Sequence, residues 1–160
     1  MDTGRWKILF AVSGALWATT AGVLVFLFVH GNTSASSDGR IAVHVNAAEK
    51  DLILREMRML LTSLNEVTTY VAGENYGEAA KSAAKVGTAM ENAAEAGHPA
   101  LIAKLPMELK RLGFATHEDM DQLSALLMNG SSQREVLSKM SETTSKCVAC
   151  HSVYRLEAAR

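Results

Sequence analysis

The stretch Lys146-Cys-Val-Ala-Cys-His-Ser-Val-Tyr-Arg155 contains both cysteines of this 160-residue chain. Cys147 and Cys150 are three positions apart, and His151 directly follows the second cysteine. On a helix, residues at positions i, i+3 and i+4 share a face, so the three side chains point in the same direction. A C-x-x-C-H spacing allows two thioether bonds to hold a haem while the imidazole reaches its iron. We therefore expect one covalently attached haem c.

Other uses of two cysteines at this spacing are a redox C-x-x-C motif, a zinc site and inert thiols. A thioredoxin-like motif usually opens a helix after a strand, and no strand pattern precedes Cys147. Zinc would need a fourth ligand beyond two cysteines and a histidine, and the sequence has no second cysteine–histidine cluster. We favour haem, with zinc and redox chemistry as the alternatives.

The composition limits the classes of function. The formal net charge of −1 argues against a nucleic-acid partner, which calls for a strongly basic surface. We see neither a Ser/His/Asp pattern nor paired carboxylates that periodicity would bring together, and so we do not expect an enzyme. The length suits one domain with an attached segment.

An uncharged apolar run, ILFAVSGALWATTAGVLVFLFV, occupies residues 8–29. As a helix at about 1.5 Å per residue it would be roughly 33 Å long, enough to cross a hydrocarbon core of roughly 30 Å. We expect a single transmembrane helix here, as an anchor or an uncleaved signal. A cleaved signal peptide, with Thr33-Ser34-Ala35 as a weak cleavage site, is the alternative.

Flanking charges predict the orientation of this helix. Arg5 and Lys7 precede the run, whereas the next lysine or arginine after it is Arg40. The positive-inside rule then places residues 1–7 in the cytoplasm and everything after Val29 outside it. Export agrees with the expected haem, because cytochromes of the c type receive their haem on the outer, periplasmic face of the bacterial inner membrane.

Residues 30–45 are expected to be a flexible linker. The segment GNTSASSDG, residues 31–39, is small and polar without periodicity. The following five residues, 41–45, alternate like a strand but are short and lack an evident partner, so we expect an extended lead-in and no sheet.

Residues 46–160 predict four helices, with capping residues at their starts and glycine at three of their joins. The connection 98–115 is expected to contain at most a short helical turn, because Pro99 and Pro106 interrupt it. The expected helices start at Asn46, Asn75, Thr116 and Ser132, and the first three end near Gly73, Glu95 and Gly130. This favours an all-α fold, an antiparallel up-down four-helix bundle preceded by one transmembrane helix.

The exported part of the chain resembles the class II cytochromes c, the cytochrome c′ group. The resemblance depends on the motif CxxCHxxYR at residues 147–155, and more loosely on residues 105–121, which are similar to the family's connection into its third helix. It implies that His151 is the proximal iron ligand and that Arg155 lies near a haem propionate. Class II relatives are often homodimers, which makes a homodimer a candidate assembly.

Members of this family divide by the residue on the first helix that faces the other side of the iron. A methionine there implies a six-coordinate haem that transfers electrons, whereas an apolar residue implies a five-coordinate haem that binds nitric oxide or carbon monoxide. Met57 falls on this position when the first helix is aligned without gaps from the Gly73-Glu74 turn. It also lies on an apolar seam with a helical period. The seam comprises Ile53, Met57, Leu60, Leu64, Val67 and Val71.

Met59 is the competing candidate for this position. It lies roughly 200° round the helix from Met57 and off the seam. Arg55 favours it, because many relatives carry an arginine four residues before the distal residue, where the Met57 register has Ile53. We expect Met57 to ligate the iron.

The sequence thus predicts a membrane-anchored, periplasmic electron carrier with one His151/Met57 haem. Its expected partners are redox proteins in or at the membrane. The alternatives are a gas-binding protein of the cytochrome c′ type and a haem subunit of a larger enzyme complex whose chemistry lies on another chain. The remaining histidines, His30, His44, His98 and His117, are expected to face solvent because none lies on an apolar seam of the expected helices.

Overall fold

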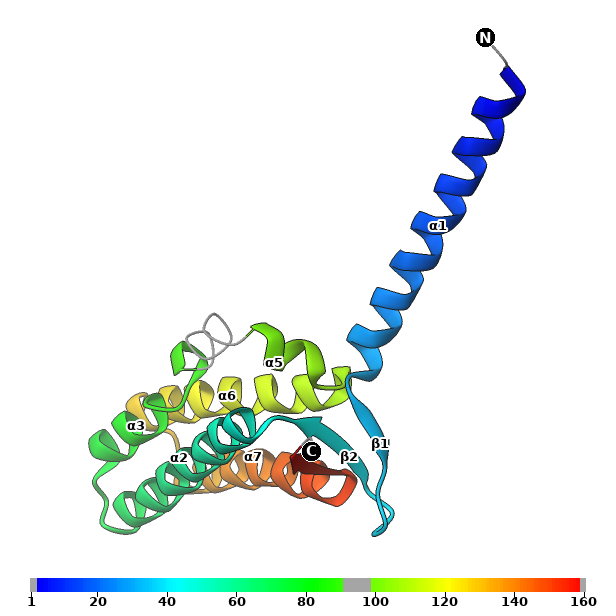
Figure 1. Ribbon diagram of the computed structural model, residues 1–160. Coiled ribbons are helices and arrows are strands. Elements are labelled where there is room, and N and C mark those ends of the chain that lie inside the picture. Colours follow the sequence, from blue (N-terminus) through cyan, green and yellow to red (C-terminus); the bar gives the residue numbers. More distant parts are fainter. Residues whose placement is uncertain (1–2, 91–98, 159–160) are drawn as a thin grey trace.

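The computed structural model describes residues 3–90 and 99–158, and most of them are helical (Figure 1). A long helix projects from a body of shorter helices, and a small sheet lies close to their junction. The helices are α1 (Thr3–His30), α2 (Ala47–Ala72), α3 (Tyr76–Ala84), α5 (Pro99–Lys104), α6 (Met107–Met128) and α7 (Gln133–Val153). The strands are β1 (Thr33–Ala35), β2 (Ile41–Val45) and β3 (Tyr154–Ala158).

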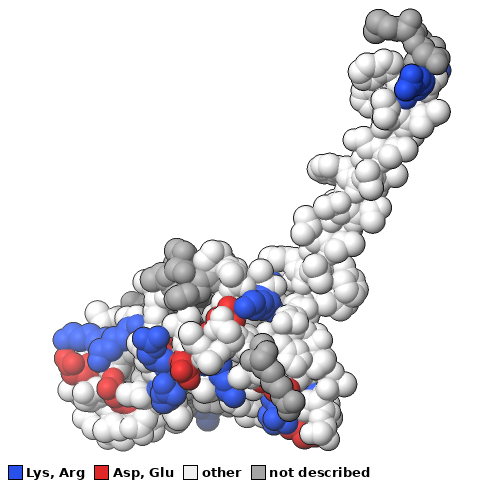
Figure 2. All heavy atoms as spheres, in the orientation of Figure 1, with Lys and Arg blue, Asp and Glu red and all other residues white. Residues whose placement is uncertain are grey.

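Helix α1 contains the apolar run expected at residues 8–29 and is long and apolar enough to span a membrane. Its side chains are exposed along nearly the whole helix, and Figure 2 shows no charge between its basic N-terminal end and the body. No part of the chain that the structure describes covers the apolar middle of α1, and such a helix needs an apolar surrounding, which a bilayer supplies.

The expectation that residues 41–45 lack a partner is wrong. Strand β2 pairs antiparallel with β1 and parallel with β3, in the order β1-β2-β3. The parallel partner comes from the C-terminal end of the chain, with Ile41 opposite Tyr154 and Val45 opposite Ala158. Part of the expected linker is therefore paired strand, and the fold is not all-α.

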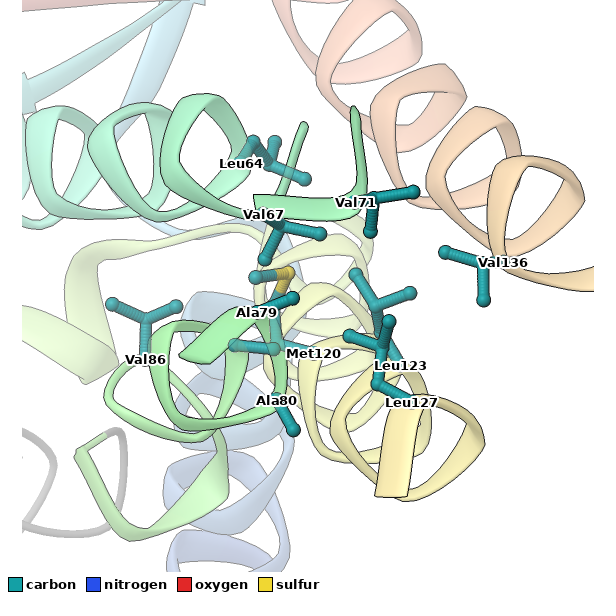
Figure 3. Close-up of a cluster of buried hydrophobic side chains, with 11 residues drawn as sticks. Leu64, Val67, Val71, Ala79, Ala80, Val86, Met120, Leu123, Leu127 and Val136 are labelled. Carbon is teal, nitrogen blue, oxygen red and sulfur yellow. The ribbon is translucent and has the colours of Figure 1, made fainter. Parts of the chain in front are cut away.

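The start of α2 agrees with the prediction, because Asn46 and Glu49 form a reciprocal capping box. The predicted seam divides into two parts along the helix. Leu64, Val67 and Val71 are buried in the main core, which Figure 3 shows between α2, α3 and α6. The other three seam residues, Ile53, Met57 and Leu60, are half-buried and line a cavity. The main core comprises Leu64, Val67, Val71, Ala79, Ala80, Ala83, Val86, Met120, Leu123, Leu127 and Val136.

The second expected helix, from Asn75 to about Glu95, is interrupted. Helix α3 ends at Ala84, a turn follows, and helical backbone resumes at Thr88. Asp121 of α6 accepts hydrogen bonds from the Thr88 backbone N–H (2.9 Å) and hydroxyl (2.7 Å). A Cβ at Gly87 would collide with the same carboxylate, so this glycine permits the close approach. Residues 91–95 of the expected helix lie outside the described part of the chain.

The third expected helix starts nine residues earlier than predicted. Helix α6 begins at Met107 with Pro106 at its N-cap, where the missing N–H of proline costs nothing. Thr116 does not cap a helix; its hydroxyl donates to the Leu112 carbonyl within α6 (2.7 Å). Helix α7 begins as predicted, with a capping box between Ser132 and Glu135.

The packing of the body follows the chain order. Helix α3 contacts both α2 and α6, and α6 also contacts α7. Residues of α2, α6 and α7 line a cavity that also contains the sequence motif.

Candidate functional site

A cavity of about 360 Å³ lies between α2, α5, α6, α7 and β3. Its volume is within the range of about 300–1,000 Å³ typical of pockets for organic ligands. Most of its wall is apolar, and this part comes from four different elements. The apolar residues lining it include Leu52, Ile53, Leu60, Leu101, Ile102, Leu105, Leu109, Leu112, Phe114 and Leu156.

The sequence motif lies at the C-terminal end of α7. Cys147, Cys150 and His151 all line the cavity, as their shared helix face predicts. Both cysteines are half-buried free thiols, and burial raises the pKa of each. His151 is more exposed than the cysteines. Two thiols and one imidazole therefore border a single hollow.

The end of α7 is held by the hairpin between β1 and β2. The backbone becomes extended at Tyr154 and continues as β3. Arg40 donates from its guanidinium to the carbonyl of His151 (3.3 Å), in the last turn of the helix, and to that of Tyr154 (3.5 Å), the extended residue that follows it. A cation at this position also interacts favourably with the negative end of the helix dipole. Arg40 thus fixes the exit of the chain from the motif.

Met57 approaches the same cavity from α2. Met59 does not; it is 42% exposed and lines a separate surface groove with Arg58. The structure therefore brings Met57 together with Cys147, Cys150 and His151, and it places Met59 on another face of the helix. The choice of Met57 over Met59 by the helical seam agrees with this arrangement, while iron ligation itself stays a prediction.

Arg155 also lines the cavity, but its guanidinium has partners within the protein. It lies 3.2 Å from the carboxylate of Asp38 and 3.3 Å from that of Glu157. The Asp38 carboxylate also pairs with the Arg40 guanidinium, at 2.7 Å. The hydrogen bond from Arg40 is the main reason why the pKa of Asp38 lies well below its usual value. This exposed cluster ties the β1–β2 turn to β3.

Helix α7 is fixed against α6 by a second charged cluster. Asp119 is 6% exposed and accepts from Lys139 (2.7 Å) and from Lys146, the residue before Cys147. Burial acts to raise the pKa of Asp119, but hydrogen bonds from these two lysines hold it below its usual value. Glu142 completes the cluster from the solvent side.

His117 contradicts the expectation of a solvent-facing side chain. It is 6% exposed, lines the cavity, and its Nδ1 lies 2.8 Å from the Val86 carbonyl oxygen. The early start of α6 places it on the inward face, three residues before the buried Met120. That spacing was the sequence signal for its burial.

The other expected solvent-facing histidines differ in their surroundings. His30 is exposed and stacks on Phe26, while His44 is half-buried beside the Ser34 hydroxyl (2.7 Å). His98 lies outside the described residues.

Lys110 is a cavity-lining residue that sequence reasoning missed. It is 4% exposed, and its Nζ donates to the Phe28 carbonyl at the end of α1 (3.0 Å) while lying 3.7 Å from the Phe28 ring centre. Burial lowers the pKa of Lys110. No pattern in residues 107–112 indicates burial, because the contact comes from the distant helix α1.

Comparisons with protein-family models, with curated proteins and with solved structures find no match to this chain. Inferences about its function therefore depend on the geometry of the cavity and on the residues that line it.

Proposed function

We propose that the chain is a membrane-anchored electron carrier with one covalently attached haem c. The observation that carries this proposal is the convergence of Met57 of α2 with Cys147, Cys150 and His151 of α7 on one apolar cavity. Two thiols for thioether bonds, an imidazole and a methionine sulfur form the donor set that such a haem requires. The residues that line the cavity therefore match the donor set of a covalently attached haem.

Each of these residues would have a separate role. Cys147 and Cys150 would hold the macrocycle, His151 would bind the iron from α7, and Met57 would bind it from α2. Haem bound in this way supplies one-electron transfer, and a methionine ligand raises its reduction potential. The apolar wall acts in the same direction, because it disfavours the additional charge of the ferric state.

A zinc site has less support from the same residues. Within residues 3–90 and 99–158, no group of three or more His, Cys, Asp or Glu side chains is arranged to hold a metal ion. A structural zinc ion needs four such ligands. Haem iron would need only His151 as a ligand from this set, because the sulfur of Met57 would supply the other ligand.

The proposed carrier includes an up-down arrangement of α2, α3, α6 and α7, extended by a helix resuming at Thr88. The charge asymmetry around α1, with Arg5 and Lys7 before the apolar run, supports a periplasmic site for the haem domain. Periplasmic or membrane-bound redox proteins would then be its partners. If Met57 only packs against the haem, the same cavity would serve a gas-binding protein.

Covalent attachment can be tested on the full-length chain, expressed with a cytochrome c maturation system and purified in detergent. The protein should carry one haem that stays with the chain under denaturing conditions. Cys147→Ala and Cys150→Ala should each shift the pyridine haemochrome band of the attached haem, because one vinyl group remains free. A chain that carries zinc and no haem would contradict the proposal.

A further inference from the structure

Lys110 is a buried cation on the wall of the cavity. Its side chain has three N–H donors, and the Phe28 carbonyl accepts one of them. In the described part of the chain no carboxylate lies within ion-pair distance of Lys110, and only burial shifts its pKa. A buried ammonium without a counter-charge is unfavourable, and proteins normally pair such groups.

The other lysine and arginine side chains that line the cavity have a carboxylate partner or access to water. Arg40 and Arg155 share Asp38, and Lys146 binds Asp119. Lys50 is half-buried and retains access to water. Lys110 is thus the one fully buried cation that lines the described cavity and has no carboxylate partner there.

Compensation for the charge of Lys110 comes from α1 only in part. The amine lies at the C-terminal end of α1, where the helix dipole is negative, and it also lies over the Phe28 ring. The helix dipole and the ring face each offer only a partial negative charge. With the Phe28 carbonyl as its one hydrogen-bond acceptor among the described residues, the ammonium keeps donors without an acceptor. Lys110 also lines the cavity, so an anionic group bound there would supply the missing acceptor.

We propose that Lys110 is the counter-charge of a haem propionate. This inference rests on the proposed haem site, because the two propionates are the anionic groups that a haem c brings into a protein. Arg155, which the family resemblance assigns to a propionate, already has Asp38 and Glu157 as partners, whereas Lys110 has none. Lys110 then links the propionate to the last turn of the membrane helix, and the haem is held directly by its anchor.

The test uses the full-length protein with its haem. Lys110→Met removes the charge at nearly unchanged length, Lys110→Gln removes it but keeps hydrogen-bonding groups, and Lys110→Arg retains it. Lys104→Met is the matched control, because Lys104 lies at the same junction but pairs with Glu49 outside the cavity. Its backbone carbonyl, which accepts from the Asn32 N–H, stays in place.

Two properties report on the propionate independently of electron-transfer activity. The propionate bending mode in the resonance Raman spectrum responds to hydrogen bonding, and the pH dependence of the reduction potential reports the propionate pKa. An opposite charge nearby lowers a carboxyl pKa by about 1–3 units, so its loss should raise that pKa by at least about one unit. The other charged or titratable groups lining the cavity stay unchanged in these variants: Arg40, Lys50, Glu56, His117, Lys146, His151, Tyr154 and Arg155.

We expect Lys110→Met and Lys110→Gln to shift both properties, and Lys110→Arg and Lys104→Met to leave them close to wild type. If Lys110→Met does not accumulate, the same comparison is made with Lys110→Gln. Variants that retain haem with an unshifted propionate mode and an unshifted titration would overturn this inference and leave the haem proposal standing. Absence of covalent haem from the wild-type protein would instead refute the proposed function itself.

Discussion

Replacement of Asp119 by alanine should destabilise the body and loosen the end of α7. Asp119 is 6% exposed, and Lys139, which it binds at 2.7 Å, is 10% exposed. Removal of one partner from a buried ion pair costs about 3–5 kcal/mol, because the other charge stays buried without compensation. Glu142 remains 3.1 Å from Lys139 but is 58% exposed, so its carboxylate offsets only part of the loss. We therefore expect Asp119→Ala to lower the free energy of unfolding by about 3 kcal/mol.

Guanidinium chloride unfolding of the full-length protein in detergent, followed by circular dichroism, measures this loss. With a slope of about 3 kcal/mol per molar, the midpoint of Asp119→Ala should fall by about 1 M. Glu142→Gln is the matched control in the same cluster, and an exposed pair of this kind contributes less than about 1 kcal/mol. Equal midpoint shifts in the two variants would refute the assignment of Asp119 as the buried centre of the cluster.

The same carboxylate predicts a dependence on pH. Because the folded protein holds the pKa of Asp119 below its usual value, the stabilisation is present above the unfolded pKa of about 3.9 and is lost as the pH falls through the folded value. Asp119→Asn should therefore lose less stability than wild type between about pH 5 and pH 2. Parallel stability curves for the two proteins would show that another group causes the acid sensitivity.

Two further predictions concern packing. Gly87→Ala should lower the melting temperature, because the new Cβ would collide with the Asp121 carboxylate at a cost of about 1–3 kcal/mol. Gly77 is the control position, because a Cβ there meets no neighbouring atom. An unchanged melting temperature for Gly87→Ala would show that the Asp121 contact is dispensable. Met120→Ala should cost about 2–5 kcal/mol in chemical denaturation because Met120 is fully buried, while Met128→Ala, at 69% exposure, should cost less than about 0.5 kcal/mol. Similar losses in both methionine variants would contradict the location of the core.

Local signals were sufficient for part of the fold. The capping boxes at Asn46 and Ser132 predicted the starts of α2 and α7, because both partners of each box lie within one turn. The helical period of the α2 seam separated Met57 from Met59, and i, i+3, i+4 spacing placed the motif residues on one face. In each case the pattern that made the prediction lies within one helix and depends only on residues close in sequence.

The features that were missed depend on contacts between distant residues. The partner of β2 is the last described segment of the chain, and the break after α3 depends on Asp121 of α6. Lys110 is buried because α1 ends above it. His117 is an exception, since its distance of three residues from Met120 was visible in the sequence; the wrong start assigned to the third helix concealed it.

Near-infrared absorption of the ferric full-length protein tests most directly whether Met57 ligates the haem iron opposite His151. The wild-type protein should show the weak band of iron–methionine sulfur ligation and a low-spin spectrum. Met57→Leu should abolish the band, and Met59→Leu, two residues away on the exposed side of α2, should retain it. A high-spin wild-type spectrum with rapid binding of carbon monoxide to the ferrous form would contradict the electron-carrier proposal, and loss of the band in Met59→Leu alone would contradict the choice of Met57.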